Sequence, residues 1–146
     1  MLDIDIDSVI PHRERMKIIS GILEIEENSA VSSAIVNPDW PLYDGEAVNS
    51  LILIEAIAQT AAIVEGHKRK QRGESAVKGW LVGIKNAEFY VEKIPVNTNL
   101  IIMLESKYSF DNYGVVEGTV KAGKKILATA TLQALRLNED NKAIIF

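Results

Sequence analysis

The chain has 146 residues, of which 47% are hydrophobic and 25% charged, and its formal net charge is −4. These values are typical of a single compact domain, and they exclude a second domain of ordinary size as well as a disordered chain. The acidic balance offers no basic surface for a phosphate backbone, so no nucleic-acid partner is expected. We expect one domain over residues 1–146.

The residue inventory excludes several kinds of site. The lack of cysteine removes disulfides, thiolate metal sites and cysteine nucleophiles, and two histidines leave little for metal ligation. We therefore expect neither a metal nor another cofactor. The most apolar stretch, Leu51–Val64, is shorter than the roughly 20 residues that span a bilayer, and the acidic amino terminus does not resemble a secretory signal. These features favour a cytoplasmic protein without a membrane span.

The first half of the chain predicts a hairpin, a loop and one long helix. Residues 16–26 and 30–36 are rich in aliphatic and β-branched side chains on either side of a polar turn. Residues 37–45 contain two prolines, two aspartates and a glycine, which exclude regular structure. Asn49 or Ser50 then caps a helix over residues 51–70.

After Gly73 the pattern changes to strands over residues 79–91, 99–109, 113–121 and 125–137, joined mainly by short turns. Along 126–134 the even-numbered residues are apolar and alternate with more polar ones, as in a half-buried strand. Two strands, one helix and four strands predict an α+β domain whose antiparallel sheet covers the helix. Apolar residues occupy most of the helix circumference, so we expect a twofold dimer to cover the remainder, unless another element of the same subunit does so.

Glu55 is the one charged residue between Ser50 and Val64. A carboxylic acid on such an apolar helix tends to keep its proton near neutral pH, which is the property that proton transfer requires. Gln59 follows four residues later on the same helix face and can orient Glu55 through a hydrogen bond. We interpret Glu55 as a general acid or base. The structural alternative is an acid at a polar edge of the helix, or one paired with a lysine or arginine.

Four segments have a recognisable pattern: Ile10-Pro11-His12-Arg13, Val36-Asn37-Pro38, the helix start Leu51–Gln59, and Val82–Phe89 followed by Pro95-Val96. Together, over residues 10–137, they resemble the hotdog-fold 3-hydroxyacyl-acyl-carrier-protein dehydratases. The resemblance implies a curved antiparallel sheet wrapped around one long central helix. It also implies a dimer with its sites at the subunit interface, an acyl chain beside the helix, and a catalytic role for Glu55.

The same resemblance draws attention to the loop before the helix. The family places a histidine there within a Gly-His-Phe-Pro-Gly motif, whereas this chain reads Pro41-Leu42-Tyr43-Asp44-Gly45-Glu46 and has no histidine between His12 and His67. Asp44, Tyr43 or Glu46 can supply the second proton relay, although polar loop residues also cap turns. A branch of predicted dehydratases associated with aryl-polyene-type clusters is more similar, because its loop also tends to carry Asp-Gly.

The remaining candidates concern substrate and carrier. Gly45 and Gln59 are the expected substrate contacts, and Trp80 either lines an acyl tunnel or belongs to the core. Acyl carrier proteins are acidic, so the basic run at the helix end is a candidate docking surface, with a solvated helix end as the alternative. His12 and His67 are assigned to structure. The basic run consists of Lys68, Arg69, Lys70 and Arg72.

We therefore expect a hotdog protein that acts as a dehydratase on acyl thioesters, carried by acyl carrier protein or another carrier, in fatty-acid, lipid or polyketide-type biosynthesis. The expected partner chain is a second copy or a related hotdog subunit. Two alternatives remain: an acyl thioesterase, because a helix carboxylate can also activate water, and a non-catalytic partner subunit that binds acyl groups or their carrier.

Overall fold

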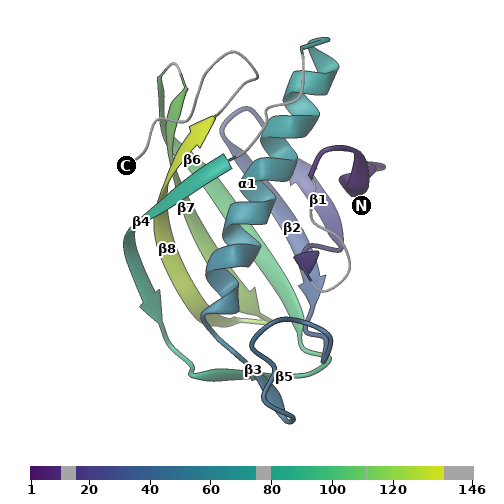
Figure 1. Cartoon of the computed structure of the whole chain (residues 1–146), viewed down its shortest axis with the longest axis vertical. Coiled ribbons are helices and arrows are strands. Elements are labelled where there is room, and N and C mark those ends of the chain that lie inside the picture. Colours follow the sequence, from purple (N-terminus) through teal and green to yellow (C-terminus); the bar gives the residue numbers. More distant parts are fainter. Residues whose placement is uncertain (11–15, 75–79, 111, 137–146) are drawn as a thin grey trace.

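The structure, a computed structural model, describes residues 1–10, 16–74, 80–110 and 112–136, without the side chains of residues 80–82 and 136. Six strands form one antiparallel sheet in the order β1-β2-β6-β7-β8-β4, and β3 pairs with β5. The sheet curves around the single long helix α1 (Figure 1), which confirms the expected α+β hotdog arrangement. In chain order the elements are η1 (Ile6–Ser8), β1 (Gly21–Ile25), β2 (Ser29–Ile35), β3 (Ala47–Asn49), α1 (Ile52–Gln71), β4 (Trp80–Phe89), β5 (Lys93–Pro95), β6 (Asn99–Phe110), β7 (Tyr113–Ala122) and β8 (Lys125–Arg136).

The concave face of the sheet packs on α1 because alternate strand residues are small or aliphatic. Along β7, every second residue from Gly114 to Val120 is buried, while the residues between them are more accessible. At Gly118 the sheet approaches the helix so closely that an added β-carbon would lie 2.5 Å from Cγ2 of Ile57. Glycine at this position therefore sets how tightly the first half of α1 sits on the sheet.

The start of α1 is fixed by the residues before it. Leu51 occupies the N-cap position and forms no side-chain cap bond, so the cap expected at Asn49 or Ser50 is wrong. The side chain of Asn49 instead accepts a hydrogen bond from the backbone N–H of Leu51 at 2.9 Å, just before the helix. The backbone N–H of Ser50 donates to the carbonyl of Glu92 at 2.9 Å. This second bond ties the helix start to the connection between β4 and β5.

Two short strands were not predicted, and one predicted boundary is wrong. β3 and β5 have three residues each and pair with one another below the start of α1 (Figure 1). They were not predicted because a run of three residues is too short to show a periodicity. The first strand begins at Gly21 rather than at residue 16. Residues 17–20 lack a strand assignment because part of their backbone bonds to a helix side chain, as described below.

The segment before β1 covers part of α1. A β-carbon at Gly66 would lie 2.9 Å from Cβ of Val9, so the amino-terminal residues pack directly on the helix. The covering by an element of the same subunit, stated as an alternative to a dimer, is thus confirmed for this face. What stays accessible is a strip of apolar helix residues, here called the open strip: Leu51, Ile54, Ala58 and Ala62. A dimer that covers the open strip stays a prediction.

Candidate active site

Glu55 lies in the first turn of α1, half-buried beside the open strip. One of its oxygens, Oε1, accepts a hydrogen bond from Nε2 of Gln59 at 2.9 Å, one helical turn further on. The bond expected from their spacing is therefore present. It fixes the direction of the carboxylate relative to the helix, which a proton-transfer group needs.

Gln59 is itself held by the chain that precedes β1. Its side chain is 1% exposed. Its Oε1 accepts the backbone N–H groups of Ile18 at 2.9 Å and Ile19 at 3.4 Å, and its Nε2 also donates to the carbonyl of Met16. Both ends of the amide are engaged within the protein. This geometry favours a positioning role for Gln59 over the predicted substrate contact, which stays a prediction.

The open strip supplies the apolar surface beside Glu55. Leu51, Ile54, Ala58 and Ala62 are three or four residues apart, so they lie on one side of the helix. Leu51 is 57% exposed, and the other three are partly buried. An acyl chain placed along this strip would pass the carboxylate of Glu55. The arrangement can therefore combine apolar binding with proton transfer.

Asp44, the predicted second acid, is engaged in a turn. Its Oδ1 accepts the backbone N–H groups of Glu46 at 2.9 Å and Ala47 at 3.0 Å, and its Oδ2 pairs with the ammonium group of Lys93. The backbone bond from Ala47, the bond from Lys93 and the bond from Glu46 together hold the pKa of Asp44 well below its ordinary value. A carboxylate so held carries no proton to donate at neutral pH. The bonds thus favour a turn-stabilising role, and a catalytic role for Asp44 stays a prediction.

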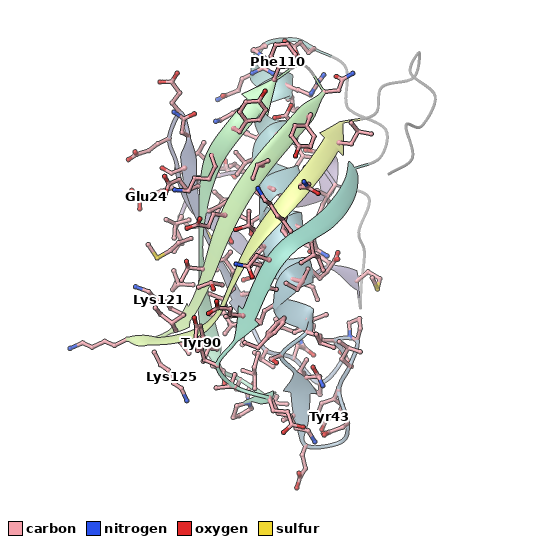
Figure 2. The ribbon with its side chains drawn as sticks, turned by 90° about the vertical axis from the view of Figure 1, so that its left-hand side faces the viewer. Glu24, Tyr43, Tyr90, Phe110, Lys121 and Lys125 are labelled. Carbon is pink, nitrogen blue, oxygen red and sulfur yellow. The ribbon has the colours of Figure 1, made fainter. Side chains whose placement is uncertain are left out.

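The other predicted loop residues lie at the same end of the molecule as the start of α1. Tyr43 bridges to Val48 through its backbone and is 37% exposed. Figure 2 shows it at the lower end of the molecule. Gly45 has a φ of 101°, a conformation that glycine adopts readily, and Leu42 has a φ of 69°. Open space surrounds the Cα of Gly45, since no atom lies within 4 Å of the position of an added β-carbon. Their contacts with substrate stay predictions.

The basic run at the end of α1 is partly neutralised by its neighbours. Arg69 pairs with Glu65 at 3.0 Å and with Glu74 at 3.5 Å, and Arg72 pairs with Glu74 at 2.8 Å. The ammonium group of Lys68 donates to the backbone carbonyl of Glu27, and that of Lys70 donates to the hydroxyl of Ser8. The run begins about 20 Å from Glu55 along the helix axis. Carrier docking there stays a prediction.

The side chains of two residues singled out from the sequence are not described by the structure. His12 lies outside the described residues, and the side chain of Trp80 is not among those described. Within the described ranges there is no cluster of three or more residues that could hold a metal ion. None of the described helices is long and apolar enough to cross a membrane. Sequence reasoning missed Lys93 and residues 16–19, because both reach the site from distant parts of the chain through backbone or loop contacts.

The fold and the site define a class of protein: a hotdog domain whose central helix carries a positioned carboxylate beside an apolar strip. Within this class, the ApeP-like family, described as the ApeP dehydratase, matches residues 4–145, and the chain belongs to that family. The chain is therefore a dehydratase-like hotdog protein, as the resemblance implied.

One relative and two solved structures are similar to this chain. The 3-hydroxyacyl-[acyl-carrier-protein] dehydratase FabZ of Streptococcus sanguinis is 26% identical over 138 residues, covering 90% of this chain and 96% of the relative. A chain of the dehydratase heterocomplex ApeI:P from Xenorhabdus doucetiae matches with a TM-score of 0.83 and 20% identity over 92% of each chain. A hypothetical thioesterase with coenzyme A from Streptococcus pneumoniae matches with a TM-score of 0.56 and 12% identity, covering 80% of this chain and 84% of that one.

Proposed function

We propose that this chain takes part in the dehydration of 3-hydroxyacyl thioesters carried by acyl carrier protein, with Glu55 as its proton-transfer group. The observation that carries the proposal is the hydrogen-bonded pair of Glu55 and Gln59 at the border of the open strip. Membership of a dehydratase family supports the reaction type, and similarity to FabZ, a 3-hydroxyacyl-[acyl-carrier-protein] dehydratase, supports the substrate class. A cytoplasmic location and the absence of a cofactor belong to the same proposal.

The reaction needs more than one group. A base removes a proton from the carbon next to the thioester carbonyl, and an acid protonates the hydroxyl that leaves from the next carbon as water. The product is the enoyl thioester, and hydrogen-bond donors must stabilise the negative charge that develops on the carbonyl oxygen in between. Glu55 can serve as one proton-transfer group. A second group must therefore join it.

We propose that a partner hotdog subunit supplies the second group. Residues 13–66 of this chain contain no histidine, and the carboxylate of Asp44 is engaged by Lys93 and the turn. The open strip beside Glu55 is the surface on which a second helix or its loops would approach. The structural neighbour ApeI:P is a dehydratase heterocomplex, which supports a related but different subunit over a second copy.

The test is a dehydration assay with a 3-hydroxyacyl carrier protein, read out by mass spectrometry as loss of water from the carrier-bound acyl group. The chain is assayed alone and after mixing with a related hotdog subunit. We expect turnover in the mixture, and a loss of at least a hundredfold in Glu55→Gln, the range in which general acid–base groups contribute. Glu24→Gln is the matched control, because Glu24 is an exposed carboxylate on β1.

The other outcomes separate the alternatives. Release of free acid would identify a thioesterase, and carrier binding without any product would identify a non-catalytic partner subunit. Full activity in Glu55→Gln would show that Glu55 is not the proton-transfer group. Full activity of the chain alone as a monomer would refute the proposal that a partner completes the site.

A further inference from the structure

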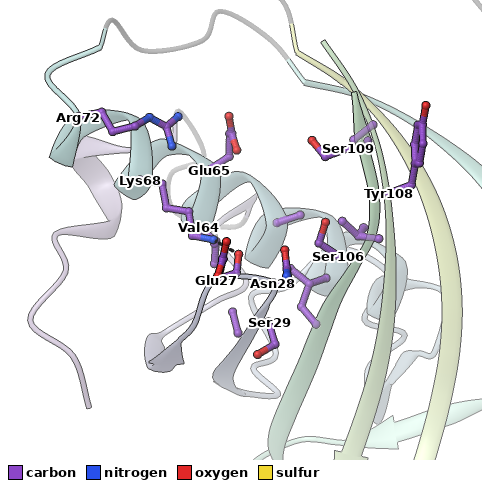
Figure 3. Close-up of a pocket in the computed structure, with 16 residues that line it drawn as sticks. Glu27, Asn28, Ser29, Val64, Glu65, Lys68, Arg72, Ser106, Tyr108 and Ser109 are labelled. Carbon is purple, nitrogen blue, oxygen red and sulfur yellow. Dashed lines mark hydrogen bonds between the residues drawn. The ribbon is translucent and has the colours of Figure 1, made fainter. Parts of the chain in front are cut away.

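A cavity of about 290 Å³ lies between the C-terminal half of α1 and the ends of β2, β6 and β7 (Figure 3). Its floor is apolar and includes Ala61, Val64, Leu104 and Val116. Three of these core residues keep 7–9% of their surface exposed, whereas Leu53 and Ile57 in the first half of the same helix are fully buried. Ala61, Val64, Leu104 and Val116 all belong to the hydrophobic core cluster, so the cavity borders the core.

The cavity arises where small side chains replace large ones. Ile57 fills the space over Gly118, but one turn further along the helix the sheet-facing residue is Ala61. Ala30 and Ala134, also small, belong to the cavity wall. Helix and sheet are therefore in close contact at Ile57 and Gly118, and a gap remains between them at Ala61.

This cavity is distinct from the candidate active site. Val64 follows Glu55 by nine residues, which places it about 13 Å further along the axis and on the opposite side of the helix. Neither Glu55 nor Gln59 belongs to the lining. A ligand in the cavity would therefore lie away from the open strip.

The rim of the cavity is polar and contains two cations. Ser106 and Ser109 come from β6, and Ser109 points towards α1 (Figure 3). The ammonium group of Lys68 donates to the backbone carbonyl of Glu27 at 2.7 Å, a bond that uses one of its three N–H donors. Arg72 lines the same rim.

Two carboxylates also belong to the lining, those of Glu27 and Glu65. Glu65 is neutralised by Arg69 in a mostly buried pair, with 18% and 19% of the two side chains exposed. Arg72 donates to both oxygens of Glu74, at 2.8 and 3.3 Å, in a pair that is about half exposed. These two bonds use two of the five guanidinium N–H donors, so the others can reach a ligand. Glu27 is exposed and screened by solvent. The charges that face the cavity thus favour an anion.

We propose that this cavity binds the aliphatic chain of a medium-chain carboxylate, with the carboxylate held at the rim by Lys68, Arg72 and the serine hydroxyls. The floor is aliphatic, and Tyr108, the aromatic residue of the described lining, is 53% exposed and packs edge-to-face on Tyr113. The cavity volume lies near the lower end of small-molecule sites. Such a ligand would bind independently of any carrier protein. The proposal does not rest on the dehydratase function.

The test is calorimetric titration of the full chain with sodium octanoate at neutral pH, with octylammonium as the probe of opposite charge. We expect saturable binding of octanoate and none of octylammonium. Lys68→Met should weaken binding about tenfold or more, because a charge-assisted hydrogen bond is lost, while the matched control Lys70→Met, outside the lining, should not. Ala61→Leu should abolish binding by filling the floor.

Val116→Leu is a second filling variant, in case Ala61→Leu does not fold. Glu55→Gln should leave octanoate binding unchanged. The proposal is overturned if octanoate does not bind, if octylammonium binds equally well, or if both filling variants retain the wild-type affinity. Loss of binding in Glu55→Gln would assign the octanoate to the open strip and would equally refute it.

Discussion

Replacing Gln59 by leucine tests the most connected polar contact of the candidate site. Leucine has a similar size and keeps the apolar packing, but it removes the acceptor for the backbone N–H groups of Ile18 and Ile19 and the donor to Glu55. Ile18 and Ile19 are 3% and 1% exposed, so water cannot replace the lost acceptor. The substitution should therefore lower the free energy of unfolding.

The size of the effect follows from the bonds. The 2.9 Å bond of Ile18 leaves one buried donor unsatisfied, at a cost of about 1–3 kcal/mol. Loss of the longer bond from Ile19 and of the bond to the Met16 carbonyl adds about 1 kcal/mol to this cost. Burial of the leucine side chain stabilises the folded state by a similar amount. A net loss of about 1–3 kcal/mol is expected, which lowers Tm by roughly 3–10 °C for a chain of this length.

Urea unfolding followed by circular dichroism measures this loss, with Gln71→Leu as the matched control. Gln71 is the exposed last residue of α1, and its replacement should change the free energy of unfolding by less than about 0.5 kcal/mol. If the two variants are equally stable, the hydrogen bonds of Gln59 do not anchor the segment before β1, and the reasoning on its positioning role is refuted.

Three further substitutions test the fold around the site. Gly118→Ala should cost about 1–3 kcal/mol through overlap with Ile57, and much less in an Ile57→Ala background; an equal cost in both backgrounds in urea unfolding would contradict the close contact. Because the pKa of Asp44 is lowered on folding, its contribution to stability is present above about pH 4 and lost as the pH falls through the folded-state pKa. Asp44→Asn should therefore lower Tm at pH 7, and the difference in Tm from the wild type should become smaller as the pH falls. A difference in Tm that stays constant across pH would show that Lys93 and the turn do not favour the ionised form of Asp44. Gly45→Ala should cost about 1–3 kcal/mol because of the positive φ, and unchanged urea unfolding would show that the loop adapts.

The regular elements were predictable because their periodicity is long and consistent. The helix expected over residues 51–70 forms over Ile52–Gln71, and β6, β7 and β8 begin at the expected residues. The alternation in β8 holds from Ala128 to Ala134, but Ile126 is exposed and Leu127 is buried. A register shift at Lys121, opposite the start of β8, explains this reversal, because one extra residue moves the side chains to the other face.

The candidate site was only partly predictable. Glu55 and Gln59 are four residues apart on one helix, so their hydrogen bond follows from local geometry alone. The ion pair of Asp44 with Lys93 joins residues 49 positions apart, and Gln59 meets the backbone of residues more than 40 positions earlier. Such contacts depend on how the loop, the helix and the amino-terminal segment pack, and no periodicity encodes them.

Local pattern by itself determined that the apolar first half of one helix carries a single acid and that an antiparallel sheet encloses the helix, since hydrophobic periodicity and turn residues act over a few positions. Tertiary packing decided what surrounds that acid: the buried amide that holds it, the turn that engages Asp44, and the face of the helix that stays open. It also decided that a cavity remains over Ala61, because the space between helix and sheet is fixed by which side chains from five separate elements meet there.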